Sequence, residues 1–278
     1  MRTASLDIQY KSPEQLVRMR AAGLLVAQTL DRVRAAVAAG VSTADLDALA
    51  EENIRASGGI PSFKGYYGYP ASLCTSVNEQ IVHAIPAATQ VLREGDLISI
   101  DCGAIVEGWH GDAAITVGVG EIRPELTRMI KVAEDAMWAG LDAAAQGTAS
   151  GRGRLTDISA AIEASIRAAG RYGIVRGYGG HGIGTEMHQD PHILNYGRPG
   201  KGPRLIPGLA LAIEPMITRG APDSVELADG WTVVTRDGSV AVHVEHTITL
   251  FDDGVLVTTA ADGGRSRLGE DALTSWTT

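Results

Sequence analysis

The chain contains an internal repeat, which limits the folds that it can adopt. Residues 44–58 align without a gap to residues 156–170, and seven of the fifteen positions are identical. Similarity between two Ala-rich helices could explain that match alone. Three further matches follow in the same order, however: His83 to Pro86 with His188 to Pro191, Gly95 and Asp101 with Gly208 and Glu214, and residues 112–117 with residues 245–250. The ordered series predicts a duplicated unit whose two copies are related by a pseudo-twofold axis.

Each copy reads as two helices followed by strands. The pattern predicts helices over 12–38, 43–57, 124–146 and 155–170, and strands over 96–101, 112–119, 209–214, 231–235 and 241–251. Ser12 before Pro13 is typical of a helix start. We therefore expect an α+β fold in which strands of both halves form one antiparallel sheet. A single domain should cover residues 1–260, with halves at about 12–120 and 121–252, and a polar, poorly ordered tail at 261–278.

Composition excludes several classes of function. A net charge of −9 argues against a general binder of nucleic acid or anionic membrane, since both need an excess of Lys and Arg. Cys74 and Cys102 are too few for a disulfide framework in 278 residues. The N-terminus lacks the apolar run of a signal peptide, and no stretch approaches the roughly 18 apolar residues of a membrane span. We expect a soluble protein of the reducing cytoplasm, with no stable nucleic-acid or membrane partner.

Four acidic residues occupy matched places in the repeat. Asp101 and Glu214 are expected to end a strand, and Asp112 and Glu245 to begin the next one. An antiparallel pairing would bring the two acids of each half together, and the symmetry would bring both pairs to the centre of the sheet. Each acid could instead be exposed or paired with a cation, for which Arg236 is the nearest candidate. Buried carboxylates without cations are costly, so a shared metal site is favoured.

His181, in the segment GGHGIG, offers the imidazole that such a site would use, although a histidine in a Gly-rich turn can also be an ordinary hydrogen-bonding residue. Four carboxylates and one imidazole can hold two divalent ions, with Asp112 and Glu245 as bridges. Two ions together activate a water molecule and polarise a carbonyl group. The oxygen-rich set favours Mn, Fe or Co over structural Zn, which prefers Cys and His.

Two histidines stand near this set in the repeat. His83 and His188 each precede a proline by three residues, at matched positions. They are candidates for contacting a substrate and stabilising a tetrahedral intermediate, and the alternative is a pair of ordinary loop histidines. The remaining histidines receive no role from the sequence: His110, His192, His243 and His246.

These segments resemble a known family, the type I methionine aminopeptidases. The resemblance covers about residues 12–252 and rests on the segments GYYGYPASLCTSVNEQIVHAIP, LISIDCG, HGDAAITV, GHGIGTEMHQDPHI, AIEPM, DGWTVVTRDGS and EHTI. It implies the pita-bread fold, in which two pseudo-symmetric α+β halves form one curved antiparallel sheet covered by helices. It also implies that two divalent metal ions are bound by Asp101, Asp112, His181, Glu214 and Glu245. Zn and Ni stay open beside Mn, Fe and Co.

The resemblance further implies a catalytic set and a methionine pocket. Glu214 would shuttle the proton of the attacking water, and His83 and His188 would contact the substrate. The pocket-lining positions fall on Tyr66, Tyr69, Cys74 and Trp231, which could alternatively be ordinary core residues. Two further pocket positions depart from the family: Met187 stands where many members carry Phe, and Phe63 where some carry Cys. A flexible thioether can fill the space of a ring, so methionine binding is expected to persist.

The implied activity is removal of the N-terminal methionine from newly made proteins whose second residue is small. A monomer is expected, with at most a transient association with the ribosome. The sequence leaves two alternatives to this activity open. One is an Xaa-Pro aminopeptidase or prolidase, which shares the fold but usually carries an additional N-terminal domain. The other is a non-catalytic binding module, which would be expected to have lost metal ligands, whereas all five are present.

Overall fold

The computed structural model describes residues 6–276, which include four long helices, and the first two of these begin at capping signals visible in the sequence. These helices are α1 (Pro13–Ala36), α2 (Thr43–Ala56), α3 (Pro124–Ala149) and α4 (Leu155–Ala169). The Ser12 side chain accepts from the amide of Gln15, whose side chain accepts in return from the amide of Ser12. Ser42 and Asp45 form the same capping box in front of α2. The predicted helices are confirmed to within a few residues at each end.

The first half builds its part of the sheet around a long hairpin. Strands β4 (Leu97–Val106) and β5 (Trp109–Gly118) pair antiparallel over their whole length. Strands β1 (Ile60–Pro61) and β2 (Leu73–Val77) pair with the other edge of β4, separated by a short 3₁₀ turn, η1 (Tyr66–Gly68). The strands predicted over 96–101 and 112–119 are confirmed, but both are longer than expected. Asp101 and Asp112 consequently lie inside strands, where pairing on both sides fixes their direction.

The second half repeats this plan with interrupted strands. A five-stranded antiparallel sheet has the order β15-β14-β9-β7-β8, formed by Gly254–Val257, His246–Phe251, Ala210–Ile213, Gly179–Gly182 and Gln189–Leu194. Strands β6 (Gly173–Ile174), β10 (Met216–Thr218) and β13 (Ala241–His243) pair beside it. A small sheet combines β3 (Gln80–Val82), β11 (Ser224–Glu226) and β12 (Val233–Thr235). The expected strand over 241–251 is therefore divided, and Glu245 lies at the division.

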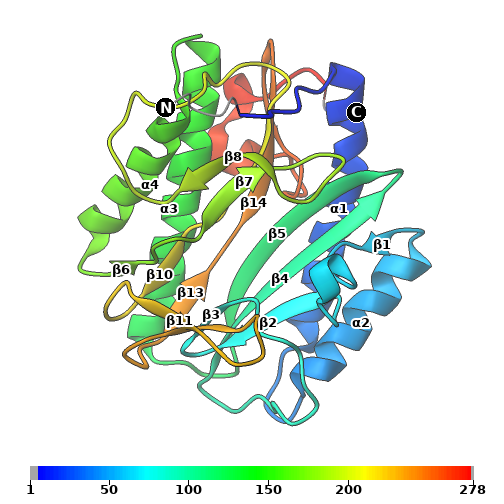
Figure 1. Cartoon of the computed structure of the whole chain (residues 1–278), viewed down its shortest axis with the longest axis vertical. Coiled ribbons are helices and arrows are strands. Elements are labelled where there is room, and N and C mark those ends of the chain that lie inside the picture. Colours follow the sequence, from blue (N-terminus) through cyan, green and yellow to red (C-terminus); the bar gives the residue numbers. More distant parts are fainter. Residues whose placement is uncertain (1–5, 277–278) are drawn as a thin grey trace.

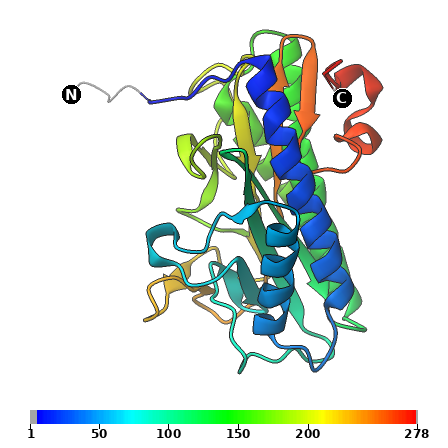
Figure 2. The same ribbon diagram turned by 90° about the vertical axis from the view of Figure 1, so that its right-hand side faces the viewer.

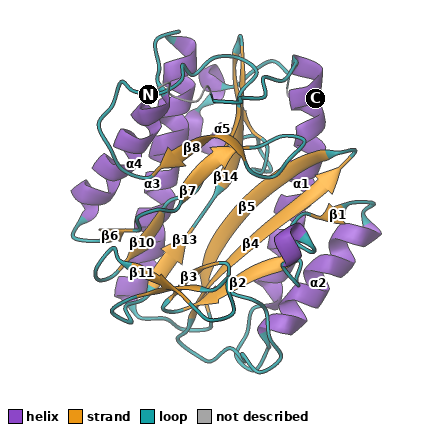
Figure 3. Cartoon of the chain, in the orientation of Figure 1, coloured by secondary structure: helices purple, strands orange, loops and turns teal. Residues whose placement is uncertain are grey.

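The two halves join in the middle of the molecule (Figures 1 and 3). Ala114 of β5 and Glu245 exchange backbone hydrogen bonds of 3.3 and 2.9 Å. On either side, the Thr116 hydroxyl donates to the carbonyl oxygen of His243 at 2.6 Å, and the Thr247 hydroxyl donates to that of Asp112 at 2.8 Å. The strands of both halves thus lie side by side, and the acids of one half face those of the other.

The helices cover one face of this sheet, as the side view in Figure 2 shows for α1. Two apolar cores lie beneath them, one for each half, containing Ile98 and Ile100 in the first and Ile213 and Ile248 in the second. Helix α1 approaches β5 very closely: a Cβ atom added to Gly111 would lie 2.6 Å from the amide nitrogen of Gly23. Only glycine permits this contact, which presses α1 against the strand that carries Asp112.

The C-terminal segment differs from the expectation of a poorly ordered tail. Residues 261–276 form a short helix, α5 (Arg265–Leu268), and a 3₁₀ turn, η2 (Glu270–Ala272). The Thr274 amide donates to the carbonyl of Val255 at 3.0 Å, and the Trp276 ring stacks on Phe251 at 6.4 Å between centroids. These long-range contacts hold the segment in place although its composition is polar. Residues 277–278 lie outside the described part of the chain. Among residues 6–276, no helix is both long and apolar enough to cross a bilayer.

Candidate metal and substrate site

The four acids converge because of strand register. Asp101 on β4 lies opposite Ala114, and Ala114 is bonded through its backbone to Glu245. Glu214 follows β9 directly, and β9 pairs with β14, which begins one residue after Glu245. Asp112 lies two residues before Ala114 and faces the same side of the sheet. The pairing expected within each half and between the halves is therefore present.

These carboxylates are buried without a cation to balance them. Asp112 and Glu245 are only 3% and 2% exposed. One oxygen each of Asp101, Asp112 and Glu245 is buried without a hydrogen-bond partner. No Lys or Arg within residues 6–276 forms an ion pair with any of the four acids, and Arg236 instead donates to the carbonyl of Ser224. Unpaired buried carboxylates are among the most costly groups in a protein, so the donor set fits bound cations.

The titration behaviour follows from this burial. Burial raises the pKa of Asp101 to about 7, and it raises the pKa of Asp112, Glu214 and Glu245 well above the usual carboxyl range. Repulsion between neighbouring acids adds to burial for Asp112 and Glu245. Without cations, these acids would bind protons more readily than ordinary carboxyl groups. A divalent ion would replace them.

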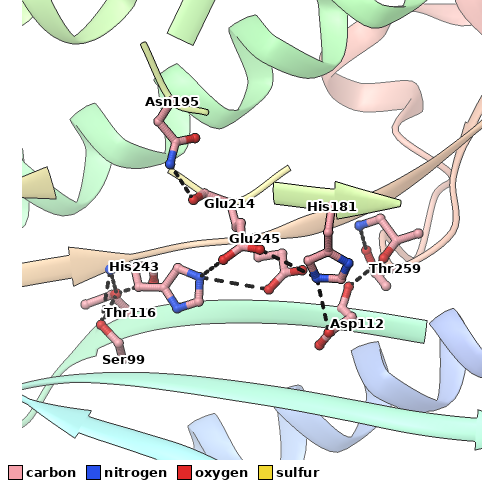
Figure 4. A network of polar contacts seen from close by, with 10 residues as sticks. Ser99, Asp112, Thr116, His181, Asn195, Glu214, His243, Glu245 and Thr259 are labelled. Carbon is pink, nitrogen blue, oxygen red and sulfur yellow. Dashed lines mark hydrogen bonds and ion pairs between the residues drawn. The ribbon is translucent and has the colours of Figure 1, made fainter. Parts of the chain in front are cut away.

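His181 is oriented toward the acids. Its Nδ1 lies 2.9 Å from the carbonyl oxygen of Gly182, which can only accept, so Nδ1 carries the proton. Its Nε2 is then free to act as a ligand, and it lies 3.5 Å from Glu214 Oε1 and 4.0 Å from Asp112 Oδ2 (Figure 4). Burial lowers the pKa of His181 to about 3, so the ring is neutral at pH 7. A neutral imidazole with its second nitrogen anchored to the backbone is the usual state of a metal-binding histidine.

Two overlapping groups of ligand atoms result. Asp112, His181 and Glu245 place one atom each within 4.8 Å of one another, and so do Glu214, His243 and Glu245. Glu245 belongs to both groups, as expected for a bridging ligand. Asp101 lies outside both groups, but the proximity of its charge raises the pKa of Asp112. No role for His243 was predicted from the sequence, although this residue precedes Glu245 by two residues and should therefore share its side of the strand.

A cavity of about 240 Å³ opens next to the acids. The structure brings every site residue expected from the sequence to its wall: Phe63, Tyr66, Tyr69, Cys74, His83, Asp101, Asp112, His181, Met187, His188, Glu214, Trp231 and Glu245. One end is apolar, since Phe63, Cys74 and Met187 pack there in one buried cluster. The ring of Tyr69 meets Trp231 edge-on at 5.0 Å, and its hydroxyl lies 2.9 Å from the carbonyl oxygen of Leu73. The cavity therefore offers an apolar pocket beside a polar, charged wall.

His83 and His188 also line this cavity. The backbone of His83 is in the left-handed region, with φ of 61°, and burial lowers the pKa of its ring to about 4. His188 lies near His181, with 4.3 Å between ring centroids, and its Nδ1 is 2.9 Å from the Tyr66 hydroxyl. Both rings are thus neutral and adjacent to the acids. The predicted pair is brought together, although its two members come from different halves.

A second cavity continues from the first. It has a volume of about 430 Å³ and shares His83, His181, His188 and Glu214 with the first cavity. Its outer wall includes Tyr178, Gln189, Asp190 and His192. The other histidines without an assigned role have structural partners, since His110 bonds to Ser62 at 2.9 Å and His246 to Thr259 at 2.8 Å. The joined cavities form a path from the apolar pocket, past the acids, to the surface.

Comparison with known proteins matches this geometry to one family. Residues 17–251 match the model of metallopeptidase family M24. The chain is 48% identical over 252 residues to a methionine aminopeptidase of Clostridium acetobutylicum, covering 91% of this chain and 98% of that protein. It is 50% identical over 257 residues to methionine aminopeptidase 1 of Mycobacterium tuberculosis, covering 91% and 95% of the two chains.

Solved structures give the same result. The crystal structure of methionine aminopeptidase from Rickettsia prowazekii superposes with a TM-score of 0.85 at 38% identity, covering 91% of this chain and all of that one. The prolidase from Pyrococcus furiosus reaches a TM-score of 0.66 at 19% identity, and this chain covers only 65% of it. The second likeness shows a shared fold alone. The expected α+β pita-bread fold is confirmed.

Proposed function

This chain belongs to metallopeptidase family M24, and we propose that it is a methionine aminopeptidase that removes the N-terminal methionine from peptides and proteins. The observation that carries the proposal is the position of the apolar cavity beside unpaired, buried carboxylates contributed by both halves of the fold. An Xaa-Pro peptidase shares the fold, but relatives with 48–50% identity along nearly the whole chain are methionine aminopeptidases.

We assign the metal-binding role to Asp101, Asp112, His181, Glu214 and Glu245. Two divalent ions held there would lower the pKa of a water molecule and polarise the scissile carbonyl group. Mn, Fe or Co suits the oxygen-rich set best, with Zn and Ni as alternatives. The buried oxygens of Asp101, Asp112 and Glu245 that lack partners support this assignment, because they are the atoms that cations would satisfy.

The pocket residues bind and orient the substrate in this proposal. The methionine side chain enters between Phe63, Cys74 and Met187, where sulfur and aromatic rings make favourable contacts. Tyr69 and Trp231, edge-on to each other, limit the width of this pocket. The rest of the polypeptide runs through the second cavity toward Tyr178. A small second residue is favoured because the passage between the two cavities is bordered by His83 and His188.

The residues of the polar wall transfer protons and stabilise charge in this proposal. Glu214 accepts a proton from the attacking water and returns it to the leaving amine, a role that suits a carboxyl group whose pKa burial raises. His188 donates a hydrogen bond from Nε2 to the oxygen of the scissile carbonyl, since the Tyr66 hydroxyl can donate to Nδ1 and select that tautomer. His83, neutral at pH 7, assists departure of the new amine.

We further propose that the substrates are the N-termini of newly made proteins in the cytoplasm. The net charge of −9 supports a protein without stable nucleic-acid or membrane partners, whose association with the ribosome is at most transient. A monomer is consistent with a catalytic cavity to which both halves of one chain contribute. The domain division at residue 260 stays a prediction.

Hydrolysis of a Met-Ala-Ser peptide in the presence of Mn²⁺ or Co²⁺ tests the proposal. We expect wild-type protein to release methionine and Asp112→Ala to lose at least a thousandfold in kcat/KM, or about 4 kcal/mol of transition-state stabilisation. The exposed acid Glu79 provides a control, since Glu79→Ala should keep wild-type rates. Full activity of Asp112→Ala, or faster cleavage of an Ala-Pro peptide than of Met-Ala-Ser, would contradict the proposal.

A further inference from the structure

We propose that His243 is an additional nitrogen ligand of the metal centre, binding through Nε2 to the ion shared by Glu214 and Glu245. The inference rests on the proposed metal site, because it assigns a sixth protein ligand to that site. It starts from an observation that the five-ligand set does not explain. The His243 ring is 2% exposed, and its Nε2 is buried without a hydrogen-bond partner.

The position of Nε2 fits a ligand. It lies 3.5 Å from Glu214 Oε2 and 3.9 Å from Glu245 Oε2 (Figure 4). Two donor atoms bound to one transition-metal ion at about 2.0–2.2 Å lie roughly 3–4 Å apart, so both distances fall in the range for ligands of a common ion. Neither contact is a hydrogen bond by geometry. The buried nitrogen is therefore directed at the carboxylates without bonding to them.

Glu214 lies between two imidazoles. Its Oε1 is 3.5 Å from Nε2 of His181, and its Oε2 is 3.5 Å from Nε2 of His243. The two rings approach the carboxylate from different elements, β7 and β13. Each of the two ligand groups in the site then contains one imidazole together with the shared Glu245. This arrangement would give each ion one nitrogen ligand.

The backbone holds His243 in this position. Its amide donates to Ser99 Oγ and Thr116 Oγ1, both at 3.2 Å, and its carbonyl accepts from Thr116 at 2.6 Å. Ser99 and Thr116 also bond to each other at 2.7 Å, which links β4, β5 and β13 beneath the ring. A ligand held by three strands needs little reorganisation when an ion binds. Buried polar atoms are normally satisfied, and metal coordination would satisfy this one.

The competing role is that of a hydrogen-bond donor to Glu214 that never contacts the metal. Such a residue also strengthens metal binding, by about 10- to 100-fold, so affinity alone does not separate the two roles. The distance between His243 Nε2 and the ion does separate the two roles. In a crystal structure of the wild-type protein with Mn²⁺ bound, we expect anomalous density within about 2.4 Å of His243 Nε2. A separation above 3 Å, with Nε2 bonded to Glu214, would overturn the inference.

Titration of Mn²⁺ into variants provides the solution test. His243→Gln should weaken one of two binding events at least tenfold, whereas His246→Gln should leave both unchanged. His246 is a matched control, because it is a partly buried histidine next to Glu245 whose ring bonds to Thr259 instead. Equal affinities of wild type and His243→Gln would argue against ligation. If His243→Gln fails to fold, the crystal structure of the wild type with Mn²⁺ determines whether His243 binds the ion.

Peptide hydrolysis, measured on the same samples, separates this inference from the proposed function. If His243 coordinates an ion and Met-Ala-Ser is not cleaved, the proposed activity fails and the ligand assignment stands. If the peptide is cleaved while Nε2 stays away from both ions, the activity stands and the ligand assignment fails.

Discussion

In the proposed mechanism, the hydroxyl of Tyr66 selects the nitrogen of His188 that acts on the substrate. Nδ1 of His188 lies 2.9 Å from that hydroxyl, and a hydrogen bond donated by the hydroxyl leaves the proton on Nε2. A carbonyl oxygen that gains negative charge needs such a donor. The pair joins an aromatic residue of the first half to a histidine of the second, so the two rings form a single functional unit.

Tyr66→Phe tests that unit. The variant keeps the ring in the pocket but loses the hydroxyl, so His188 can populate the other tautomer. We expect kcat to fall about tenfold, equivalent to about 1.4 kcal/mol, while KM for a Met-Ala-Ser peptide changes little. Steady-state kinetics provides the measurement. Tyr67→Phe is the control, because Tyr67 is 85% exposed. A rise in KM without a fall in kcat would show that the hydroxyl serves binding alone.

At the scale of elements, the segment before α1 supports the loop that carries Met187 and His188. Gln9 Nε2 donates to Thr185 Oγ1 at 2.9 Å, and Gln9 Oε1 accepts from Gln189 Nε2 at 3.0 Å. The amide of Asp7 donates to Asp190 at 2.9 Å. These bonds fasten both ends of the segment 185–190 from a part of the chain about 180 residues away.

Gln9→Ala should loosen this loop without touching the metal ligands. We expect kcat/KM for Met-Ala-Ser to fall several-fold, in line with about 1 kcal/mol for lost hydrogen bonds, while Mn²⁺ affinity stays at the wild-type value. Hydrogen exchange at residues 185–190 should accelerate. Unchanged exchange in that loop would show that the N-terminal segment only lies against it.

For the whole molecule, the proposed metal site is the place where the two halves depend on each other. Asp101 and Asp112 come from one half, and His181, Glu214 and Glu245 from the other. Without cations, the acids repel one another across the junction. With cations, the same acids cross-link the halves. Metal binding should therefore stabilise the whole fold rather than one loop.

Metal removal and pH should act together on stability. The pKa of Asp101 is raised to about 7, so the folded metal-free protein holds more protons than the unfolded chain between about pH 4 and pH 7. This group by itself lowers stability as pH rises through that window, whereas the buried neutral rings of His83 and His181, whose pKa values are lowered to about 4 and about 3, act in the opposite direction. At pH 8, Mn²⁺ at 100 times its dissociation constant should add about 2.7 kcal/mol, or roughly 5–10 °C in Tm.

Thermal unfolding of chelator-treated and Mn²⁺-loaded samples at pH 5 and pH 8 provides the measurement. Asp101→Asn is the informative variant, because it removes the carboxyl group whose pKa sets the upper limit of the window. Without metal at pH 8, it should be more stable than the wild type, and Mn²⁺ should stabilise it less. The histidine contributions are common to both proteins, so the stability of metal-free Asp101→Asn relative to the wild type should increase from pH 5 to pH 8, and a difference that does not change with pH would contradict this account of the site.

Local and repeated patterns were enough to predict much of this protein. The capping residues Ser12 and Ser42 determine where α1 and α2 begin, since a cap acts within one helical turn. The repeat predicted that Asp101, Asp112, Glu214 and Glu245 would meet, because duplicated units place equivalent strands around a common axis. The pocket residues Tyr66, Tyr69, Cys74 and Trp231 came from family resemblance, since no periodic pattern marks them.

Other features were decided by tertiary structure alone. His243 resembles any histidine in an apolar strand until register places its Nε2 between Glu214 and Glu245. The tail at 261–276 is polar in sequence, yet Trp276 stacks on Phe251 and Thr274 bonds to Val255. Gln9 gains its role from Thr185, far along the chain. These contacts depend on which strands become neighbours, and that depends on the free energy of the whole packed chain rather than on any local segment.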